Sequence, residues 1–571
     1  MGTITIDGQQ VEFTDEKNIL QVIRKAGIEL PTFCYHSELS IYGACRLCMV
    51  EDPKGRMMAS CSTPPWDGAV IRTTSSKLRK HRKMILELLL ASHCRDCTTC
   101  NKSGRCKLQE LALRYGIRDI RFPSGSTERV IDNSSPALVR DPGKCILCGD
   151  CVRVCAEKQG VGVLDFMHRG ARLTVATAFE KPLAESRCTS CGQCAAVCPT
   201  GAITVRSHKD DVYKLLDKPG TRMVAQIAPA VRVALGEEFG EISGENVMGR
   251  LVCALRHLGF DEVYDTSAGA DLTVLEEADE LLNRLENGGK LPLFTSCCPA
   301  WVEALRNRYP EMSGHLSSCK SPMSMLGAVI KTHHQSTQAV DGKKTHVVAI
   351  MPCSAKKAEA ARTELATAAG KDVDLVLTTQ EISDMIAEAG LVFAELEPSG
   401  CDMPFSLASS SGMIFGVTGG VTEAVLRRLD QNFTPQSLSE IAKLGMRGSA
   451  ARKVLTVPFK NRHLRIAVIH GLKEAVNLMQ ELKAGKIELD FVEVMACPEG
   501  CIGGAGQPVP RSSHSAERAR RARGLYRTGN LNQIKRAEEN PAINALYFGV
   551  LRGRQHQLLH LASDERKAIE P

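Results

Sequence analysis

"CILCGDCVRVC" (residues 145–155) and "CTSCGQCAAVC" (residues 188–198) are two runs of sequence with the same cysteine spacing, C-x2-C-x2-C-x3-C. The second run begins 43 positions after the first and is followed by Pro199. Identical spacing at a fixed interval indicates a duplicated structural unit. Zinc sites usually combine two C-x2-C pairs without a third cysteine in step, so the pattern favours iron–sulfur clusters over zinc.

The spacing resembles that of bacterial two-cluster ferredoxins, in which the fourth cysteine of each run ligates the other cluster. The resemblance implies a ferredoxin-like domain with two [4Fe–4S] clusters. One cluster would be held by Cys145, Cys148, Cys151 and Cys198. The other would be held by Cys188, Cys191, Cys194 and Cys155.

The overall composition is that of a globular protein with an unusual number of cysteines. The chain has 571 residues, more than one hydrophobic core usually fills, so several domains are expected. No apolar run is long enough to span a bilayer, and no charged-then-apolar leader opens the chain, so we expect a cytoplasmic protein. Without a leader, 24 cysteines indicate metal or redox chemistry rather than disulfides.

Two stretches are locally basic, "RTTSSKLRKHRK" (72–83) and "RSSHSAERARRARGLYR" (511–527), although the formal net charge is only +7. Such runs can bind nucleic acid. The ordinary interpretation is a solvated face, and a docking surface for an acidic electron carrier is the intermediate one. We predict no nucleic-acid partner.

The first residues predict a small β-rich domain. "TITIDGQQVEF" (3–13) alternates around Asp7-Gly8, a strong hairpin signal, and "DEKNILQVIRKAG" (15–27) has helical spacing with a C-terminal glycine. The local sequences "CYH" (34–36) and "GACRLCMVE" (43–51) resemble the N-terminal [2Fe–2S] domain of the large electron-input subunit of respiratory complex I and of clostridial hydrogenases. The resemblance implies a β-grasp fold, with zinc as the alternative metal. The cluster ligands would be Cys34, Cys45, Cys48 and Cys61.

A predicted helix, about 77–92, leads to a third cysteine set in "HCRDCTTCNKSGRC" (93–106). The spacing H-x3-C-x2-C-x5-C resembles that of a [4Fe–4S] site with one histidine ligand in the same two families. The implied ligands are His93, Cys97, Cys100 and Cys106. A structural histidine is the alternative for His93, and Cys94 is an extra cysteine beside it.

From about residue 210, strands such as "MVAQIAP" (223–229) and "HVVAIMP" (346–352) alternate with helical stretches, which predicts an α/β domain. Three peptides there combine cysteine with other reactive side chains. They are "FTSCCPAW" (294–301), "MPCSAKKAE" (351–359) and "EVMACPEGCIGGAGQP" (493–508).

Together these peptides closely resemble the three signature motifs of the [FeFe]-hydrogenases, and the domain order resembles the multi-cluster clostridial type over nearly the whole chain. The resemblance implies reversible H2 formation from protons and electrons at an H-cluster. This cofactor is a [4Fe–4S] cubane joined to a two-iron unit that carries CO, cyanide and an azadithiolate bridge. The implied cubane ligands are Cys298, Cys353, Cys497 and Cys501, and Cys501 would also bridge to the two-iron unit.

The same resemblance implies roles for the other residues. Met351, Met495 and Phe415 would line the two-iron unit. Lys356, a side chain with three donors, would donate to one cyanide, with Glu359 close by.

The adjacent cysteines would have different tasks: Cys298 binds iron, whereas Cys297 exchanges protons with the amine bridge. The proton relay would continue through Glu277, Ser317 and Glu280 towards solvent near Arg284. Glu277 and Glu280 are three positions apart, so they share a helix face. The alternative for this acidic pair is a solvated helix surface.

Some positions depart from the family pattern. Glu499 and Ala505 replace residues that are more commonly glycine, and Met323 and Ala230 differ from the polar residues of the clostridial type. Met323 and Ala230 are expected near the two-iron unit. Three further cysteines are interpreted as packing residues, with Cys319 the one expected near the pocket: Cys253, Cys319 and Cys401.

These inferences give a multidomain α/β protein. The expected domains are a plant-type-like [2Fe–2S] domain (1–78), a [4Fe–4S] domain with one histidine and three cysteine ligands (79–125), a two-cluster ferredoxin-like domain (126–209), an H-cluster domain (210–508) and a helical extension (509–571). The glycine-rich "GMIFGVTGG" (412–420) is weak evidence for a nucleotide site. The expected electron partner is therefore either ferredoxin or a set of flavoprotein subunits that oxidise NAD(P)H. H-cluster assembly proteins are expected as further partners.

Two alternative functions compete with this interpretation. A non-catalytic electron-transfer subunit of a complex I-like assembly explains the first 210 residues but not the three later peptides. An H2 sensor built on the same cofactor tends to lack the relay cysteine and to carry a signalling domain, whereas Cys297 is present.

Overall fold

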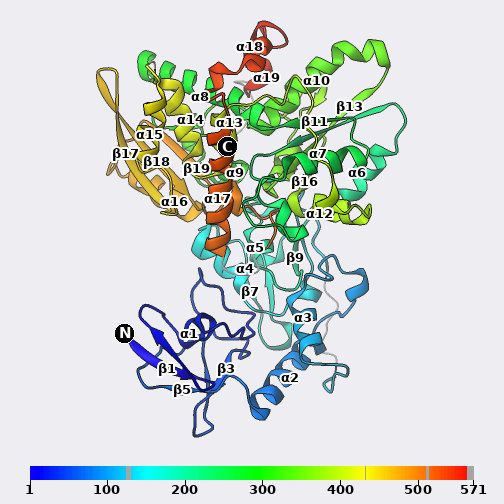
Figure 1. Ribbon diagram of the computed structural model, residues 1–571, viewed down its shortest axis with the longest axis vertical. Helices are drawn as coiled ribbons and strands as arrows, with labels where there is room; N and C mark the ends of the chain where they lie inside the picture. Colours follow the sequence, from blue (N-terminus) through cyan, green and yellow to red (C-terminus); the bar gives the residue numbers. More distant parts are fainter. Residues whose placement is uncertain (124–129, 431, 510–513, 562–571) are drawn as a thin grey trace.

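The computed structural model describes residues 1–123, 130–430, 432–509 and 514–561. Figure 1 shows a lower lobe made by the first part of the chain and a larger upper lobe that contains two β-sheets. The duplicated cysteine segment (cyan) connects them. The expected boundary at residues 125 and 126, and parts of the expected range 509–571, lie outside the described residues.

The N-terminal hairpin and helix form as the sequence predicts. β1 (Gly2–Ile6) pairs antiparallel with β2 (Gln9–Phe13) through a turn in which Asp7 and Gly8 have φ of 49° and 90°. α1 (Ile19–Lys25) begins after Asn18, whose side chain accepts a hydrogen bond from the Gln21 N–H. β5 (Val70–Ile71) adds in parallel to β1, and β3 (Met49–Glu51) pairs with β4 (Met57–Ala59).

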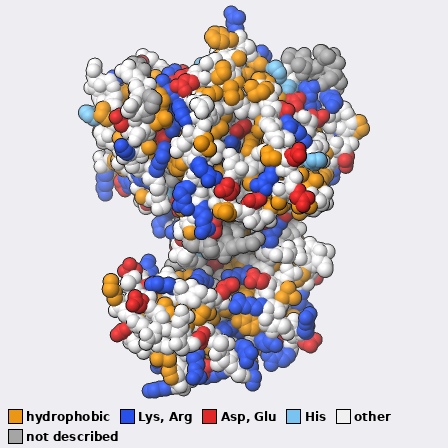
Figure 2. Space-filling view, viewed as in Figure 1, with side chains coloured by type: hydrophobic (Ala, Val, Ile, Leu, Met, Phe, Trp, Pro, Cys, Tyr) orange, Lys and Arg blue, Asp and Glu red, His pale blue; other side chains and the backbone are white. Residues whose placement is uncertain are grey.

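α2 (Ser76–Ala91) confirms the helix expected near 77–92, but its basic face is not wholly solvated. Arg82 is buried and donates to the carbonyl oxygens of Leu47, Met49 and Thr73 at 2.7–3.1 Å. It therefore ties the helix to the cysteine-rich loop. The other basic residues, among them Lys80 and Lys83, are exposed, and Lys and Arg side chains are frequent on the lower lobe (Figure 2).

The two cysteine runs share one backbone conformation. Leu147 and Ser190 both have φ of 55°, and the glycines two residues later have φ of 76° and 71°. Short helices follow, α4 (Asp150–Arg153) and α5 (Gln193–Ala196). The duplication expected from the cysteine spacing is thus present in the structure. The accompanying elements are α3 (Lys107–Arg114), β6 (Leu138–Arg140), β7 (Asp165–Met167), β8 (Thr174–Ala176), β9 (Ile203–Val205) and α6 (Lys209–Leu216).

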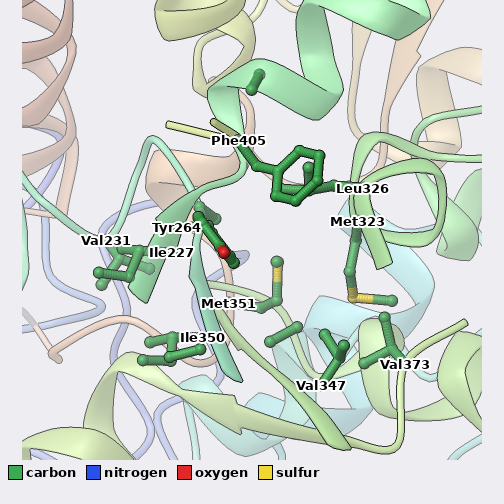
Figure 3. Close-up of a cluster of buried hydrophobic side chains, with 14 of the residues drawn as sticks. Ile227, Val231, Tyr264, Met323, Leu326, Val347, Ile350, Met351, Val373 and Phe405 are labelled. Carbon is green, nitrogen blue, oxygen red and sulfur yellow. The ribbon is translucent and has the colours of Figure 1, made fainter. Parts of the chain in front are cut away.

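The first sheet of the upper lobe is parallel, with strand order β11-β10-β13-β16. Its strands are β10 (Thr221–Ile227), β11 (Glu262–Asp265), β13 (Lys344–Met351) and β16 (Leu375–Thr378). The helices around it are α7 (Met248–His257), α8 (Ser267–Asn287), α10 (Pro322–Asp341), α11 (Ala355–Ala360), α12 (Thr379–Glu388) and α13 (Ser410–Met413). Figure 3 shows its apolar core, where Met323 and Met351 lie among aliphatic side chains.

The second sheet has the order β12-β19-β18-β17, with only the β17–β18 pair antiparallel. Its strands are β12 (Leu293–Phe294), β17 (Arg452–Phe459), β18 (Arg462–His470) and β19 (Phe491–Met495). The helices here are α9 (Pro299–Arg308), α14 (Gly420–Leu429), α15 (Pro435–Lys443) and α16 (Leu472–Lys483). A two-residue hairpin, β14 (Ala366–Thr367) with β15 (Gly370–Lys371), lies outside both sheets.

The C-terminal part is helical, as expected. It contains α17 (His514–Leu531), α18 (Pro541–Phe548) and α19 (Gln555–Leu559). The expectation of a solvated basic face is wrong for Arg518 and Arg521, which are buried in ion pairs because α17 packs against the rest of the upper lobe. Across the described ranges, every helix is too short or too polar to cross a membrane.

Candidate functional site

A buried cavity of about 80 Å³ lies where strands of both sheets end. β10 and β13 end at Ile227 and Met351, and β12 and β19 end at Phe294 and Met495. The carboxyl ends of parallel strands are the usual location of ligand sites in α/β proteins. The residues after these strands line the cavity, among them Ala230, Cys297, Cys298, Met323, Met351, Cys353, Lys356, Phe415, Met495, Cys497 and Cys501.

The four predicted cubane ligands all lie in this cavity, as free thiols. Burial raises the pKa of Cys353 and of Cys501 to about 12. Cys353 and Cys497 are buried, and Cys298 and Cys501 are half-buried. Such a site disfavours bare thiolates but suits thiolates that are bound to iron. The backbone N–H of Ala496 donates to Cys298 Sγ at 3.4 Å. The donor set and the free space both fit the [4Fe–4S] half of an H-cluster.

A charged pair lies at the edge of the cavity. Lys356 Nζ donates to Glu359 Oε2 at 2.6 Å and to the Cys297 carbonyl at 3.3 Å. Burial opposes the charge on Lys356, but the Glu359 carboxylate outweighs it and raises the pKa of the ammonium group. Ser321 and Ser324 donate to the other oxygen of Glu359. Two of the three Lys356 donors are used, which leaves one for a ligand in the cavity.

The inner half of the predicted relay consists of Cys297 and Glu277, which are both buried. Glu277 on α8 is fully buried, so the alternative of a solvated surface is wrong for it. Its Oε1 accepts from the Ser296 N–H at 3.1 Å, whereas its Oε2 has no partner among the described residues. Burial, and then the nearby charge of Glu277, raises the pKa of the Cys297 thiol well above its ordinary value. The thiol is therefore neutral.

The outer half of the relay is connected by hydrogen bonds. Ser317 Oγ donates to Glu280 Oε2 at 2.8 Å, and Arg284 donates to Glu280 Oε1 at 2.6 Å. The same guanidinium also donates to the carbonyl oxygens of Lys290 and Leu316 at 2.9 Å. Arg284 thus holds Glu280 in place next to Ser317.

Sequence reasoning missed the residues that join Glu280 to the C-terminal helices. Ser318 donates to Glu280 through its backbone N–H and its hydroxyl, at 2.9 and 3.1 Å. The Ser318 hydroxyl also hydrogen-bonds His560 Nδ1 at 2.8 Å, and His560 Nε2 lies 2.8 Å from Glu276 Oε2. His560 is far from these residues in sequence, so no local spacing could have indicated it.

A prediction follows for the relay carboxyl group Glu277, whose pKa burial raises from 4.5 to about 8. Between these pH values the native protein keeps a proton that the unfolded chain has lost, so stability falls as pH rises through this window. In the wild type this decline lowers the free energy of unfolding by about a few kcal/mol at pH 8, and Glu277→Gln should remove it. If Glu277 belongs to the predicted proton relay, the substitution should also lower the hydrogenase activity that the resemblance implies by about 100-fold or more. Anaerobic melting of the cluster-loaded protein at pH 5 and pH 8, with activity assays, measures both effects.

The neighbouring Glu276 is the matched control. Burial raises its pKa, but hydrogen bonds from His560 and Tyr547 outweigh this, and the net pKa is lowered. Such a group stabilises the protein above its unfolded pKa and loses that contribution as pH falls. Glu276→Gln should therefore destabilise the protein at neutral pH. Parallel pH slopes for wild type and Glu277→Gln would contradict the assignment of Glu277.

In the ferredoxin-like part, the fourth cysteine of each run lies with the first three cysteines of the other run. One small cavity is lined by Cys145, Cys148, Cys151 and Cys198. A second cavity is lined by Cys155, Cys188, Cys191 and Cys194. These are the groupings that the ferredoxin resemblance implied, so each set of four thiols surrounds its own space.

Two cysteines of the first N-terminal set lie close together. The Cys45 N–H donates to Cys34 Sγ at 3.3 Å, and the Phe33 N–H donates to Cys45 Sγ at 3.4 Å. Cys34, Cys106 and Cys148 belong to one hydrophobic cluster, although they come from three different cysteine sets. Three of the four predicted accessory cluster sites therefore lie next to one another.

His93 is buried and its two ring nitrogens differ. Nδ1 accepts from the Arg95 N–H at 3.3 Å, and Cys94 Sγ lies 3.8 Å from the same nitrogen. Nε2 has no partner among the described residues. A buried ring nitrogen without a partner fits a metal ligand, and Cys94 lies on the other side of the ring.

The departures from the family pattern fall into two groups. Ala230 and Met323 line the cavity, as expected. Glu499 lies in the loop between Cys497 and Cys501 with φ of 60°, and it pairs with Arg518 of α17 at 3.2 Å. Arg518 also pairs with Glu38 of the N-terminal domain. One buried guanidinium therefore connects the N-terminal domain to the catalytic loop.

Arg518→Met is expected to lower the free energy of unfolding by about 3 kcal/mol, because it leaves Glu38 and Glu499 without their cation. Adding Glu499→Gly should recover part of the loss. Arg527→Met, on the same helix but in an exposed pair with Glu245, should cost less than about 1 kcal/mol. Anaerobic guanidinium titration measures all three variants. Equal losses for Arg518→Met and Arg527→Met would show that Arg518 is not a connector.

Comparison with known proteins agrees with this arrangement. Residues 221–505 match the family "Iron only hydrogenase large subunit, C-terminal domain". Residues 1–76 match a 2Fe-2S iron-sulfur cluster binding domain, residues 82–121 the NADH-ubiquinone oxidoreductase-G iron-sulfur binding region, and residues 144–202 a 4Fe-4S dicluster domain. The domain types inferred from the cysteine sets are thus confirmed.

Two relatives align with this chain over almost their whole length. The chain is 40% identical to the NADP-reducing hydrogenase subunit HndD of Solidesulfovibrio fructosivorans, over 100% of both chains. It is 36% identical to iron hydrogenase 1 of Clostridium pasteurianum, over 98% of this chain and 99% of that protein. The structure of a variant of [FeFe]-hydrogenase HydA1 from Chlamydomonas reinhardtii matches with a TM-score of 0.54 and 35% identity. That match covers 62% of this chain and 98% of that one.

Proposed function

The chain belongs to the iron-only, or [FeFe], hydrogenase family, whose members form or oxidise H2. We propose which role each residue of the site has in that reaction. The observation that carries the proposal is the buried cavity at the strand ends, which combines five cysteines, Lys356 and three methionines. The adjacent Cys297 and Cys298 have different surroundings there: the Glu277 charge acts on Cys297, whereas a backbone N–H donates to Cys298.

Cys298, Cys353, Cys497 and Cys501 would hold the H-cluster, and Cys501 would also serve its two-iron unit. When bound, this cofactor supplies the iron that binds hydrogen and an amine that exchanges the proton. The remaining donor of Lys356 would bind one cyanide of the cofactor, while Glu359 keeps the ammonium group charged. Met351, Met495 and Phe415 exclude water from the cavity.

Cys297 passes protons between the cavity and Glu277. A neutral thiol can accept and donate a proton without keeping a charge in a dry cavity. The free Oε2 of Glu277 is the next acceptor, and Ser317 and Glu280 carry the proton outward. The raised pKa of Glu277, about 8, suits a group that must gain and lose a proton near neutral pH.

Electrons enter through the accessory clusters. Cys34, Cys45, Cys48 and Cys61 hold a [2Fe–2S] cluster, and His93 with Cys97, Cys100 and Cys106 holds a [4Fe–4S] cluster. The two cysteine sets of the ferredoxin-like domain hold two further [4Fe–4S] clusters. Assembly proteins build the H-cluster.

The electron partner is a flavoprotein that oxidises or reduces NAD(P)H. Two similarities support this choice. One of the full-length relatives is named as an NADP-reducing hydrogenase subunit. Residues 82–121 match an iron-sulfur binding region of an NADH-ubiquinone oxidoreductase. The glycine-rich segment 412–420 contributes Phe415 and Gly416 to the catalytic cavity, so it serves that site. The proposed NAD(P)-linked partner also supports a cytoplasmic location for this protein.

The test is anaerobic expression with H-cluster assembly proteins, followed by assay of H2 production from reduced methyl viologen. Full iron loading with rapid H2 production is expected. A protein that carries a complete H-cluster but neither makes nor oxidises H2 would overturn the proposal and favour a sensor. Adding NADPH without a flavoprotein should give no H2, whereas adding the flavoprotein should restore production.

A further inference from the structure

The second cysteine run packs directly on the catalytic cavity. Ser354, next to Cys353, donates its hydroxyl to the Ser190 carbonyl at 2.8 Å. A Cβ on Gly192 would lie 2.2 Å from Ser354 Oγ and 2.7 Å from the Ala505 Cβ, so only glycine allows this approach. Cys191 packs in the same hydrophobic cluster as Cys298 and Cys353. The cluster site of the second run therefore adjoins the catalytic cysteines.

One side chain spans this junction. Gln193, between Cys191 and Cys194, is buried, and its Nε2 donates to Cys497 Sγ at 3.4 Å and to the Gly503 carbonyl at 3.1 Å. The Gly503 oxygen can only accept a hydrogen bond, so the nitrogen of the amide must face it. Both N–H groups are thus directed at the loop that carries Cys497 and Cys501.

A hydrogen bond to a ligand sulfur has a defined electronic consequence. The reduced form of a cluster carries one more negative charge than the oxidised form, so a donated N–H stabilises it more. Hydrogen bonds to the sulfurs are among the factors that determine cluster potentials. We propose that Gln193 is a positioning residue that raises the reduction potential of the active-site cubane and so favours electron entry from the adjacent cluster.

The step is a transfer of one electron. The reduced cluster held by Cys155, Cys188, Cys191 and Cys194 loses the electron, and the cubane gains it; no bond forms or breaks and no proton moves. The inference rests on the proposed function only in taking Cys497 as a cubane ligand. It does not require that the protein turn over H2.

The test is Gln193→Leu in the full-length, cluster-loaded protein, with the cubane potential followed by EPR during anaerobic redox titration. We expect the potential to shift negative by about 59 mV, which corresponds to about a tenfold change in the reduction equilibrium of a one-electron couple. Gln159→Leu is the matched control. Gln159 is also buried and lines the same cluster cavity as Gln193, but its amide makes no hydrogen bond among the described residues.

An unchanged cubane potential in Gln193→Leu, with full iron content, overturns the inference. An equal shift in Gln159→Leu also overturns it, because the effect would then be general to the cluster cavity. If Gln193→Leu loses iron, Gln193→Met keeps the length of the side chain without the donor and is titrated in its place. A shifted potential in a protein that makes no H2 would uphold this inference while the proposed function failed.

Discussion

Cys297→Ala should lower H2 production from reduced methyl viologen by at least about 100-fold while the iron content stays at the wild-type level. Among the described residues that line the cavity, Cys297 is the thiol without an assigned bond to iron, and the Glu277 carboxyl group, when ionised, helps to raise the pKa of this thiol. Its removal interrupts proton exchange but leaves all four predicted cubane ligands in place. Anaerobic assays together with iron analysis measure the two quantities separately.

Cys319→Ala is the matched control for this prediction. Cys319 is also buried, and burial and then the Glu277 charge raise the pKa of its thiol, but it lies outside the cavity. Its loss should change activity by only a few-fold. Equal losses in both variants would mean that any buried thiol near Glu277 matters, and would remove the special role of Cys297.

Cys353→Ala should abolish H2 production and the EPR signal of the active-site cubane. Cys353 follows β13 closely, and its backbone position is held by the parallel register of β10 and β13. An alanine there leaves iron with one ligand fewer in a cavity that excludes water, so the cubane should not be retained. Iron analysis should show the loss of one cluster, with the signals of the accessory clusters preserved.

Cys253→Ala on α7 is the control for that experiment. Cys253 is half-buried and lies outside the catalytic cavity, so iron content and activity should match wild type. Retention of the cubane signal in Cys353→Ala would contradict the ligand assignment and reopen the choice among the cavity cysteines.

The iron–sulfur domains could be predicted from the sequence because short, local segments determine their backbone conformation. In each ferredoxin-like run the left-handed residues Leu147 and Gly149, or Ser190 and Gly192, turn the chain within a few positions. That conformation directs the nearby cysteines to one point, so spacing alone carries the information. The hairpin at Asp7 and Gly8 and the helix start at Asn18 depend on similarly short segments. The three catalytic peptides were recognised differently, through their resemblance to the signature motifs of the family.

Other features depend on packing between distant segments, and local sequence contains no signal for them. The Gln193–Cys497 hydrogen bond joins residues 304 positions apart, and the Ser318–His560 bond joins residues 242 apart. Arg518 connects Glu499 to Glu38, 480 positions away, although its stretch was interpreted as a solvated face. Likewise, α8, which carries the buried Glu277, packs against α10, α13 and α14. Local backbone conformation positions ligands within a motif, whereas burial, charge pairing and bonds between motifs arise only when the two sheets and the lower lobe pack together.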